Sequence, residues 1–142
     1  MSTESDTPSP NAVVIQILIA DGDVGIVELL QRMVAGFATR NRRFEFHTAD
    51  SIAKTLAILK RERFDVILLD LNMTDGVDAV ELIRQIRQQE REGGIERLKT
   101  RIVCTTYHNS DREKLASTAG ADRFIYKPFD AREVRMKLQR TL

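Results

Sequence analysis

Two patterns of apolar and polar residues alternate along the chain from residue 12 to its end. Five short segments are apolar at most positions, or at every second position, which is typical of strands in a buried sheet. They are residues 12–20, 42–49, 64–70, 100–106 and 121–126. Each is followed by a segment that favours a helix, in most cases because its apolar residues recur every three or four positions.

Residues with strong positional preferences mark the ends of these helical segments, since serine and aspartate favour N-caps and glycine favours C-terminal ends. The candidate N-caps are Asp23, Asp50 or Ser51, and Asp130, and the candidate stop signals are Gly93, Gly94 and Gly120. Between these helices, the charged run from Arg87 to Arg101 is most simply a solvated helix end and loop.

Five strand–helix units in series predict an α/β fold, with a doubly wound parallel sheet covered by helices on both faces. We expect the flavodoxin-like (βα)5 arrangement with strand order 2-1-3-4-5, in one domain over residues 12–142. Residues 1–11 are polar, contain no hydrophobic segment and predict a short disordered tail.

This topology predicts where polar residues at the strand ends meet. Ligands of open α/β sheets bind beyond the carboxyl ends of the strands, where the strand order reverses, here between the first and third strands. Asp21 and Asp23 follow the first strand and Asp70 ends the third. Thr105 and Lys127 stand at the ends of the fourth and fifth strands. We therefore expect three carboxylates, a hydroxyl and an ammonium at one edge of the sheet.

Three crowded carboxylates repel one another unless a cation compensates their charge. Mg²⁺ accepts one or two carboxylates, keeps several waters and binds phosphate oxygens. A lysine and a hydroxyl complete the groups that stabilise a transferring phosphoryl group. Asp70 ends the central strand and is the best placed carboxylate to act as the nucleophile, forming an acyl phosphate.

Composition narrows the class of protein further. The chain has 22 Lys and Arg against 21 Asp and Glu, so nothing in its charge points to nucleic acid or to a membrane surface. No apolar run is long enough to span a bilayer. The chain has a single cysteine, Cys104, which is consistent with a protein of the reducing cytoplasm. We predict that Cys104 is a buried, unreactive thiol. His47 and His108 lack the spacing of metal ligands and read as ordinary surface residues.

Several fragments, taken in order, resemble the response-regulator receiver domains of two-component signalling, of the chemotaxis-regulator type. These are "ILIAD", "FDVILLDLNM", the threonine that closes the fourth strand, and "AGADRFIYKPF". The resemblance runs from about Ile15 to Leu142. It implies that Asp70 is the phosphoacceptor, and that Mg²⁺ or Mn²⁺ is held by Asp21, its acidic neighbour, Asp70 and the backbone carbonyl of Asn72.

The resemblance also implies a switch. Thr105 matches the hydroxyl that contacts the phosphoryl group, Lys127 matches the lysine that pairs with it, and Phe124 matches an aromatic residue that moves with the threonine. Pro128 is expected to follow a cis peptide bond. Phosphorylation would then alter the surface formed by the fourth helix, the fifth strand and the fifth helix.

The partners implied by the resemblance are a histidine kinase or a histidine phosphotransfer protein, and a downstream protein target. The same surface would also serve for homodimer formation. Such a protein accepts a phosphoryl group and can release it, but is not a turnover enzyme. The chain fits either a stand-alone regulator or the receiver part of a longer one.

This chain departs from the family at several positions. Gly22 stands where most relatives carry the acid that ligates the metal directly, and because side chains alternate along a strand, Asp23 is on the same face as Asp21 and is the alternative ligand. Thr74 replaces a common proline, Ala79 replaces a glycine, and the loop before the predicted third helix is one residue longer. Thr106 replaces a small alanine and would narrow access to the site.

Three other functions are alternatives to that of a phosphorylated receiver domain. Gly22 favours a pseudo-receiver that binds proteins without being phosphorylated. "DLNMT" resembles the signature of haloacid-dehalogenase-like phosphatases, but Asn72 takes the place of their acid/base. A nucleotide- or flavin-binding module is disfavoured because no glycine-rich loop follows any strand.

Overall fold

The computed structural model describes residues 8–73, 78–93, 99–108 and 110–141, and in them strands and helices alternate as predicted. The elements are β1 (Val13–Ala20), α1 (Val24–Ala35), β2 (Arg42–Ala49), α2 (Ile52–Arg61), β3 (Val66–Asp70), α3 (Ala79–Glu92), β4 (Arg101–Thr106), α4 (Ser110–Ala119), β5 (Arg123–Tyr126) and α5 (Ala131–Thr141). The strands begin up to two residues later than the sequence patterns predict. For β5 the reason is that the N–H of Ala121 still bonds to the oxygen of Ala116 at the end of α4.

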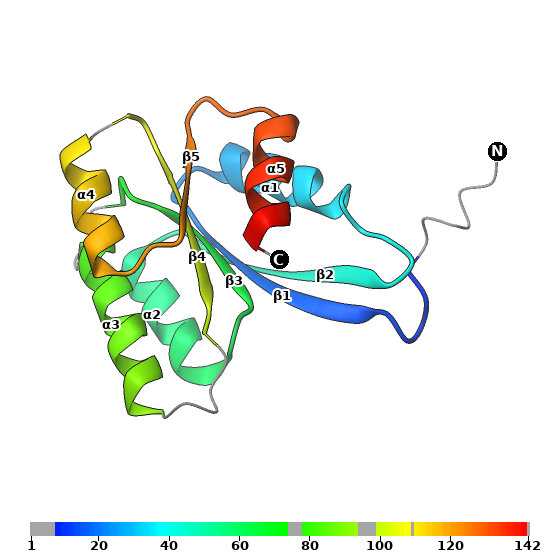
Figure 1. The fold of residues 1–142 in the computed structure, drawn as a ribbon, viewed down its shortest axis with the longest axis horizontal. Coiled ribbons are helices and arrows are strands. Elements are labelled where there is room, and N and C mark those ends of the chain that lie inside the picture. The colour runs from blue at the N-terminus through cyan, green and yellow to red at the C-terminus, as the bar shows by residue number, and fades with distance from the viewer. Residues whose placement is uncertain (1–7, 74–77, 94–98, 109, 142) are drawn as a thin grey trace.

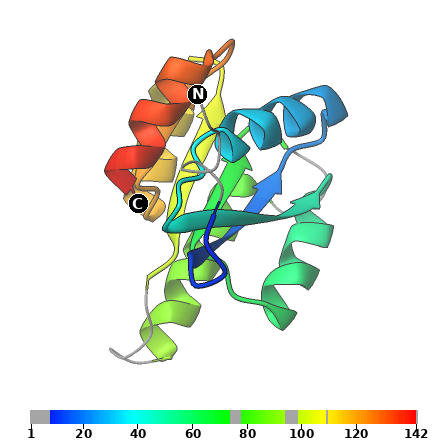
Figure 2. The ribbon, with the colours of Figure 1, turned by 90° about the vertical axis from the view of Figure 1, so that its right-hand side faces the viewer.

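All neighbouring strands are parallel, in the order β2-β1-β3-β4-β5, so the predicted topology is confirmed. Figures 1 and 2 show α1 and α5 on one face of the sheet and α2, α3 and α4 on the other. The β3–β4 register places Asp70 beside Thr105, and the β4–β5 register places Thr106 beside Tyr126. The residues expected at the functional edge are therefore neighbours in the sheet.

The apolar strand residues divide between the two faces. Alternating residues of β1 enter opposite cores: Leu18 packs under α2 and α3, and Ile17 and Ile19 pack under α1 and α5. Every residue of β3 is buried, as expected for the central strand of a doubly covered sheet. Full burial of each such aliphatic side chain contributes roughly 1.5–3 kcal/mol, which fixes the register and hence the position of Asp70.

Among the predicted helix ends, Ser51 is the N-cap of α2, because its Oγ accepts from the N–H of Lys54 at 3.0 Å. Asp50 instead pairs with Lys54 at 2.8 Å. Gly120 ends α4 with a φ of 122°, in the left-handed region that favours glycine. A Cβ at this position would lie 2.7 Å from Cγ of Arg87.

The prediction that the run beginning at Arg87 is solvated is wrong for Arg87 itself, which is buried. Its guanidinium lies between α3, the start of β4 and the turn before β5. It forms ion pairs with Glu90 and Asp122 and donates to the backbone oxygens of Thr100 and Gly120. Burial is tolerated here because each donor has a partner.

The N-terminal tail and the loop before α3 lie largely outside the described residues. Residues 1–7 of the predicted tail, and Thr74 with the rest of the loop at 74–77, lie outside the described residues. Ser9 donates its N–H to the oxygen of Arg40 at 2.8 Å, so residue 9 contacts the α1–β2 connection.

No helix among the described residues has both the length and the apolar character needed to cross a bilayer. Cys104 is fully buried, as predicted, and burial raises the pKa of its thiol far above the usual range.

Candidate functional site

The candidate site is built on one buried lysine between two buried carboxylates at the carboxyl edge of the sheet. Nζ of Lys127 lies 3.2 Å from Oδ2 of Asp21 and 3.3 Å from Oδ1 of Asp70. The exposed fractions of Lys127, Asp21 and Asp70 are 9%, 2% and 7%. These residues come from the ends of β5, β1 and β3, so the parallel topology brings together groups that are up to 106 positions apart.

The electrostatics of this site leave negative charge incompletely compensated. Burial raises the pKa of Asp21, and the charge of Asp70 raises it further. The N–H of Asp23 and the ammonium of Lys127 act in the opposite direction, without cancelling the effect of burial. A carboxyl group with a raised pKa at a strand end is a mark of sites that bind a cation or transfer a charged group.

Asp70 is held by the backbone that follows it. Its Oδ1 accepts a hydrogen bond from the N–H of Asn72 at 2.9 Å. The N–H of Leu71 donates to the oxygen of Thr105 at 3.0 Å, which continues the β3–β4 ladder past the strand end. Thr105 and Thr106 are both buried, and the hydroxyl of Thr106 donates to the oxygen of Tyr107 at 2.8 Å.

Asp23 acts as the N-cap of α1. Its Oδ1 accepts from the N–H groups of Gly25 at 2.9 Å and Ile26 at 3.3 Å. Its own N–H donates to Oδ1 of Asp21 at 2.9 Å. Its additional role as a metal ligand stays a prediction. Gly22, between the two acids, does not have a positive φ, and a Cβ there would lie 3.5 Å from the oxygen of Asp50, an ordinary contact.

A magnesium ion fits part of the predicted ligand set. Among the described residues, no group of three or more His, Cys, Asp or Glu side chains is arranged to hold a metal ion. Asp21 and Asp70 do lie together, since both reach the same ammonium, and Mg²⁺ needs only one or two carboxylates. They face an open depression of about 580 Å³, which Asn72 also lines and which leaves space for water and phosphate oxygens. Asp21, Asp70 and the carbonyl of Asn72 are thus the groups that could hold the ion.

The predicted switch residues lie beside this site and under α4. Phe124 is partly buried and packs against the core under α2, α3 and α4. The N–H of Lys127 donates to the oxygen of Thr106 at 2.8 Å, and the Lys127–Pro128 peptide bond is cis. The structure therefore connects the position of the lysine to the ends of β4 and β5.

Sequence reasoning missed several residues around the site. The hydroxyl of Tyr126 donates to Glu113 of α4, and this bond is the main reason why the pKa of Tyr126 rises to about 12. The ring of His108 stacks on that of Tyr126, with 3.8 Å between centroids. Arg112 of α4 bonds to the oxygen of Leu71, next to the candidate phosphoacceptor. No local pattern marks these contacts, because they depend on how α4 lies against the sheet.

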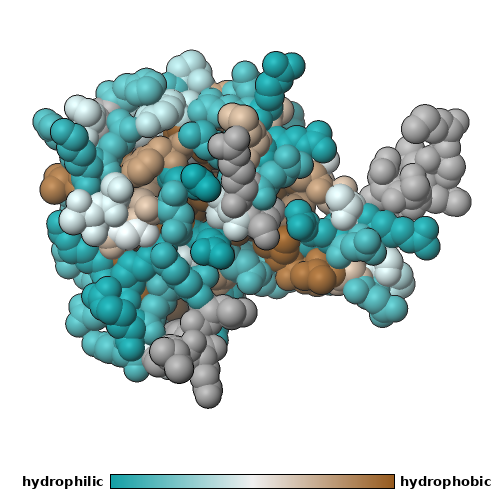
Figure 3. Space-filling view, in the orientation of Figure 1, coloured by the Kyte–Doolittle hydropathy of each residue, from teal (hydrophilic) through white to brown (hydrophobic). Residues whose placement is uncertain are grey.

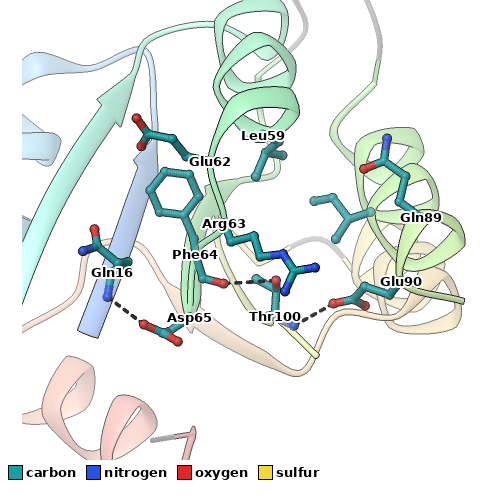
Figure 4. Close-up of a pocket in the computed structure, with 10 residues that line it drawn as sticks. Gln16, Leu59, Glu62, Arg63, Phe64, Asp65, Gln89, Glu90 and Thr100 are labelled. Atoms are coloured by element: carbon teal, nitrogen blue, oxygen red, sulfur yellow. Dashed lines mark hydrogen bonds between the residues drawn. The ribbon is translucent and has the colours of Figure 1, made fainter. Parts of the chain in front are cut away.

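A second hollow, of about 300 Å³, lies between α2 and α3 at the opposite edge of the sheet (Figure 4). Its lining includes Gln16, Asp65 and Thr100, near the amino ends of the strands. Several of its polar groups bond to one another: the N–H of Gln16 donates to Asp65 at 2.8 Å, and Thr100 Oγ1 donates to the oxygen of Phe64 at 3.1 Å. None of the predicted site residues lines this hollow.

Comparison with known proteins shows the family to which this chain belongs. The family described as "Response regulator receiver domain" matches residues 17–139. Over 128 residues the chain is 30% identical to the alkaline phosphatase synthesis transcriptional regulatory protein PhoP of Bacillus subtilis, covering 89% of this chain and 48% of that protein. It is 30% identical to the virulence sensor protein BvgS of Bordetella pertussis over 135 residues, which are 93% of this chain and 10% of that protein. The chain thus spans about half or less of these relatives.

Solved structures show the same fold. The chemotaxis response regulator CheY4 of Vibrio cholerae superposes with a TM-score of 0.76 at 24% identity, over 92% of this chain and 100% of that one. A CheY-like response regulator receiver domain protein from Methanospirillum hungatei gives 0.74 at 23% identity, over 90% and 93% of the two chains.

Proposed function

The chain belongs to the response regulator receiver domain family, and from this premise we propose that it accepts a phosphoryl group on Asp70. The observation that carries the proposal is the ammonium of Lys127 between Asp21 and Asp70, at 3.2 and 3.3 Å. The buried ammonium of Lys127, which follows β5 and reaches the end of the central strand β3, supplies positive charge where a phosphoryl group would add negative charge.

The donor in this proposal is a phosphohistidine of a histidine kinase or of a phosphotransfer protein. An oxygen of Asp70 attacks phosphorus, the P–N bond breaks as the new P–O bond forms, and the imidazole leaves and takes up a proton. Lys127 neutralises charge on the phosphoryl oxygens, and the Asn72 N–H holds the carboxylate in place. Mg²⁺, when bound, supplies further charge neutralisation beside Asp21 and Asp70.

The output of this domain is a change at the surface formed by α4, β5 and α5. Thr105 would move toward the phosphoryl group, and Phe124 would follow it. Leu115 of α4 and Met136 of α5 are exposed large apolar residues on these helices. The face in Figure 3 is mostly hydrophilic, with small separate apolar patches, which fits a surface for reversible protein binding rather than a permanent interface. A downstream protein or a second copy of the chain would be the partner.

A pseudo-receiver is the second candidate, and Gly22 is the observation that favours it. Without the usual acid at this position, Asp21 and Asp70 are the two carboxylates that pair with Lys127 among the described residues. The backbone does not require a glycine, because a Cβ at position 22 has an ordinary contact distance to its nearest neighbour. The substitution Gly22→Asp is therefore structurally permitted and can test whether the missing acid limits metal binding.

The deciding experiment incubates the wild type and Asp70→Asn with acetyl phosphate and with beryllofluoride, with and without Mg²⁺. We expect intact mass to show one phosphoryl group on the wild type only when Mg²⁺ is present, and none on Asp70→Asn. Gly22→Asp should bind Mg²⁺ about tenfold more tightly, in the range expected when a carboxylate is added to a hard-cation site. A wild type that never reacts while Gly22→Asp does would support the pseudo-receiver. Repeated turnover of a phosphate monoester would contradict both candidates.

A further inference from the structure

Arg112 of α4 reaches across to the loop that follows β3. Its Nη2 donates to the backbone oxygen of Leu71 at 2.8 Å and to Oδ1 of Asp78 at 2.8 Å. Its Nη1 donates to Oδ2 of Asp78 at 3.3 Å. The guanidinium is thus oriented by a bidentate contact with a carboxylate, and the same orientation directs one donor at the peptide group next to Asp70.

The oxygen of Leu71 and the N–H that holds Asp70 are two ends of one peptide group. That N–H belongs to Asn72 and donates to Oδ1 of Asp70 at 2.9 Å. A trans peptide group is planar and rigid, so its C=O and N–H cannot be oriented independently. The hydrogen bond from Arg112 to the oxygen therefore constrains the direction of the N–H that holds the carboxylate.

The groups on either side of the Leu71–Asn72 peptide are held by other contacts, and Arg112 orients the carbonyl of this peptide. The N–H of Leu71 is tied to Thr105 in the sheet, so the preceding peptide is fixed by β4. Asp78 is fixed on the other side, because its Oδ1 also accepts from the N–H of Val80 and caps α3. The ion pair lowers the pKa of Asp78, with its hydrogen bond to Arg112 as the main cause, so the anchor stays charged.

We propose that Arg112 is a positioning residue for phosphoryl transfer to Asp70, and that the Leu71–Asn72 peptide group links this carboxylate directly to α4. The inference rests on the proposed function of Asp70. It adds a second connection between the site and α4, separate from Thr105 and Phe124. A change in the hydrogen bonding of Asp70 Oδ1 would therefore be transmitted to Arg112 through the rigid Leu71–Asn72 peptide group.

The test compares Arg112→Ala and Arg112→Lys with Arg84→Ala as the matched control, all in the full chain. Arg84 forms an exposed pair with Glu81 of the same helix at 3.1 Å, so its removal takes away one positive charge without contacting the Leu71–Asn72 peptide. The first measurement is the amide resonance of Asn72 in the unphosphorylated protein. The second is the rate of phosphorylation by acetyl phosphate with Mg²⁺, as a function of acetyl phosphate concentration.

We expect Arg112→Ala to shift the Asn72 amide resonance and to lower the maximal rate about tenfold, as expected for a reacting group that is no longer well oriented. The half-saturating concentration of acetyl phosphate should not change. Arg112→Lys should give intermediate values, because a single ammonium can reach Leu71 but cannot form the bidentate contact. Arg84→Ala should match the wild type in both measurements.

An unchanged Asn72 resonance with an unchanged rate in Arg112→Ala would overturn the inference, as would equal effects of Arg84→Ala. If Arg112→Ala does not fold, Asp78→Asn decides, since asparagine keeps a capping oxygen for α3 while removing the charge that anchors Arg112. It should shift the Asn72 resonance in the same direction, and no shift would overturn the inference. A wild type that is never phosphorylated would refute the proposed function, while the Asn72 resonance still decides the role of Arg112.

Discussion

Two buried cations lie at opposite ends of the strands of the same sheet, and they differ in how completely their hydrogen-bond donors are satisfied. Arg87, at the amino edge, has five N–H donors and makes five hydrogen bonds of 2.7 to 3.0 Å. Lys127, at the carboxyl edge, has its two carboxylates at the longer distances of 3.2 and 3.3 Å. A network in which every donor and acceptor is paired stabilises the fold, whereas a charged group whose donors are not fully paired can still bind a ligand.

The neighbours of the two cations show the same difference. Glu90 accepts from both Arg87 and the N–H of Thr100, and Asp122 accepts from Arg87 and the N–H of Ile102. Asp21, in contrast, has a raised pKa despite its contact with Lys127. We infer that the charges at the amino edge stabilise the fold, and that the charges at the carboxyl edge are kept in a less stable arrangement for function.

The largest effect on stability should come from breaking the saturated network. Arg87→Met removes the guanidinium and leaves Glu90 and Asp122 without their buried partner, which should lower the free energy of unfolding by about 3 kcal/mol. Urea unfolding measures this loss. Arg91→Met, on an exposed position of the same helix, is the control and should change stability little. Phosphorylation of the folded Arg87→Met protein should proceed as in the wild type, and a selective loss of phosphorylation would contradict the division between the two edges.

The corresponding change at the other edge should affect reactivity more than stability. Lys127→Met removes the positive charge between Asp21 and Asp70, and should reduce the rate of phosphorylation by acetyl phosphate about 100-fold. The time course of intact mass measures this rate. Lys54→Met is the control, because Lys54 is exposed and pairs with Asp50, which lines the same depression. If both lysine variants slowed the reaction equally, general charge rather than the position of Lys127 would be responsible.

The sequence predicted one edge of the sheet much better than the other. The apolar runs of β1 and β3 require burial on both faces, and parallel topology then places Asp21, Asp70 and Lys127 together without any knowledge of contacts. Arg87 was assigned to a solvated run because its neighbours in sequence are charged. Its spacing from Ile83, on the buried face of α3, was the signal that could have identified it as buried.

Other parts of the site could not be predicted, for physical reasons. Arg112 and Leu71 are 41 positions apart, and their contact depends on the rotation of α4, whose apolar pattern is weak: Ala116 is its one buried residue among those described. Aspartate is favoured both as a helix N-cap and as a metal ligand, so the sequence alone could not decide between these roles for Asp23. Its hydrogen bonds from the N–H groups of Gly25 and Ile26 identify it as the cap. Sequence patterns determine where strands end, but they do not determine how polar side chains beyond those ends are oriented.

The smallest effect we predict concerns the pH dependence contributed by Asp21. Because its pKa is raised above the ordinary value of 3.8, the folded protein binds more protons than the unfolded chain between 3.8 and that raised pKa. Ionisation of Asp21 therefore costs stability as the pH rises through this window. Asp21→Asn removes this cost and should therefore be more stable than the wild type at neutral pH.

Urea unfolding between pH 3 and pH 8, without divalent cations, measures this difference. The advantage of Asp21→Asn should be absent below the ordinary pKa of an aspartate, grow as the pH rises, and then stay constant. Asp50→Asn is the control of opposite sign, because its hydrogen bond to Lys54 lowers the pKa of Asp50, so this carboxylate contributes stability that is lost as the pH falls. An Asp21→Asn protein that is less stable than the wild type at neutral pH would mean that Lys127 fully compensates Asp21. The carboxyl edge would then be as saturated as the network around Arg87, and the distinction between the two edges would fail.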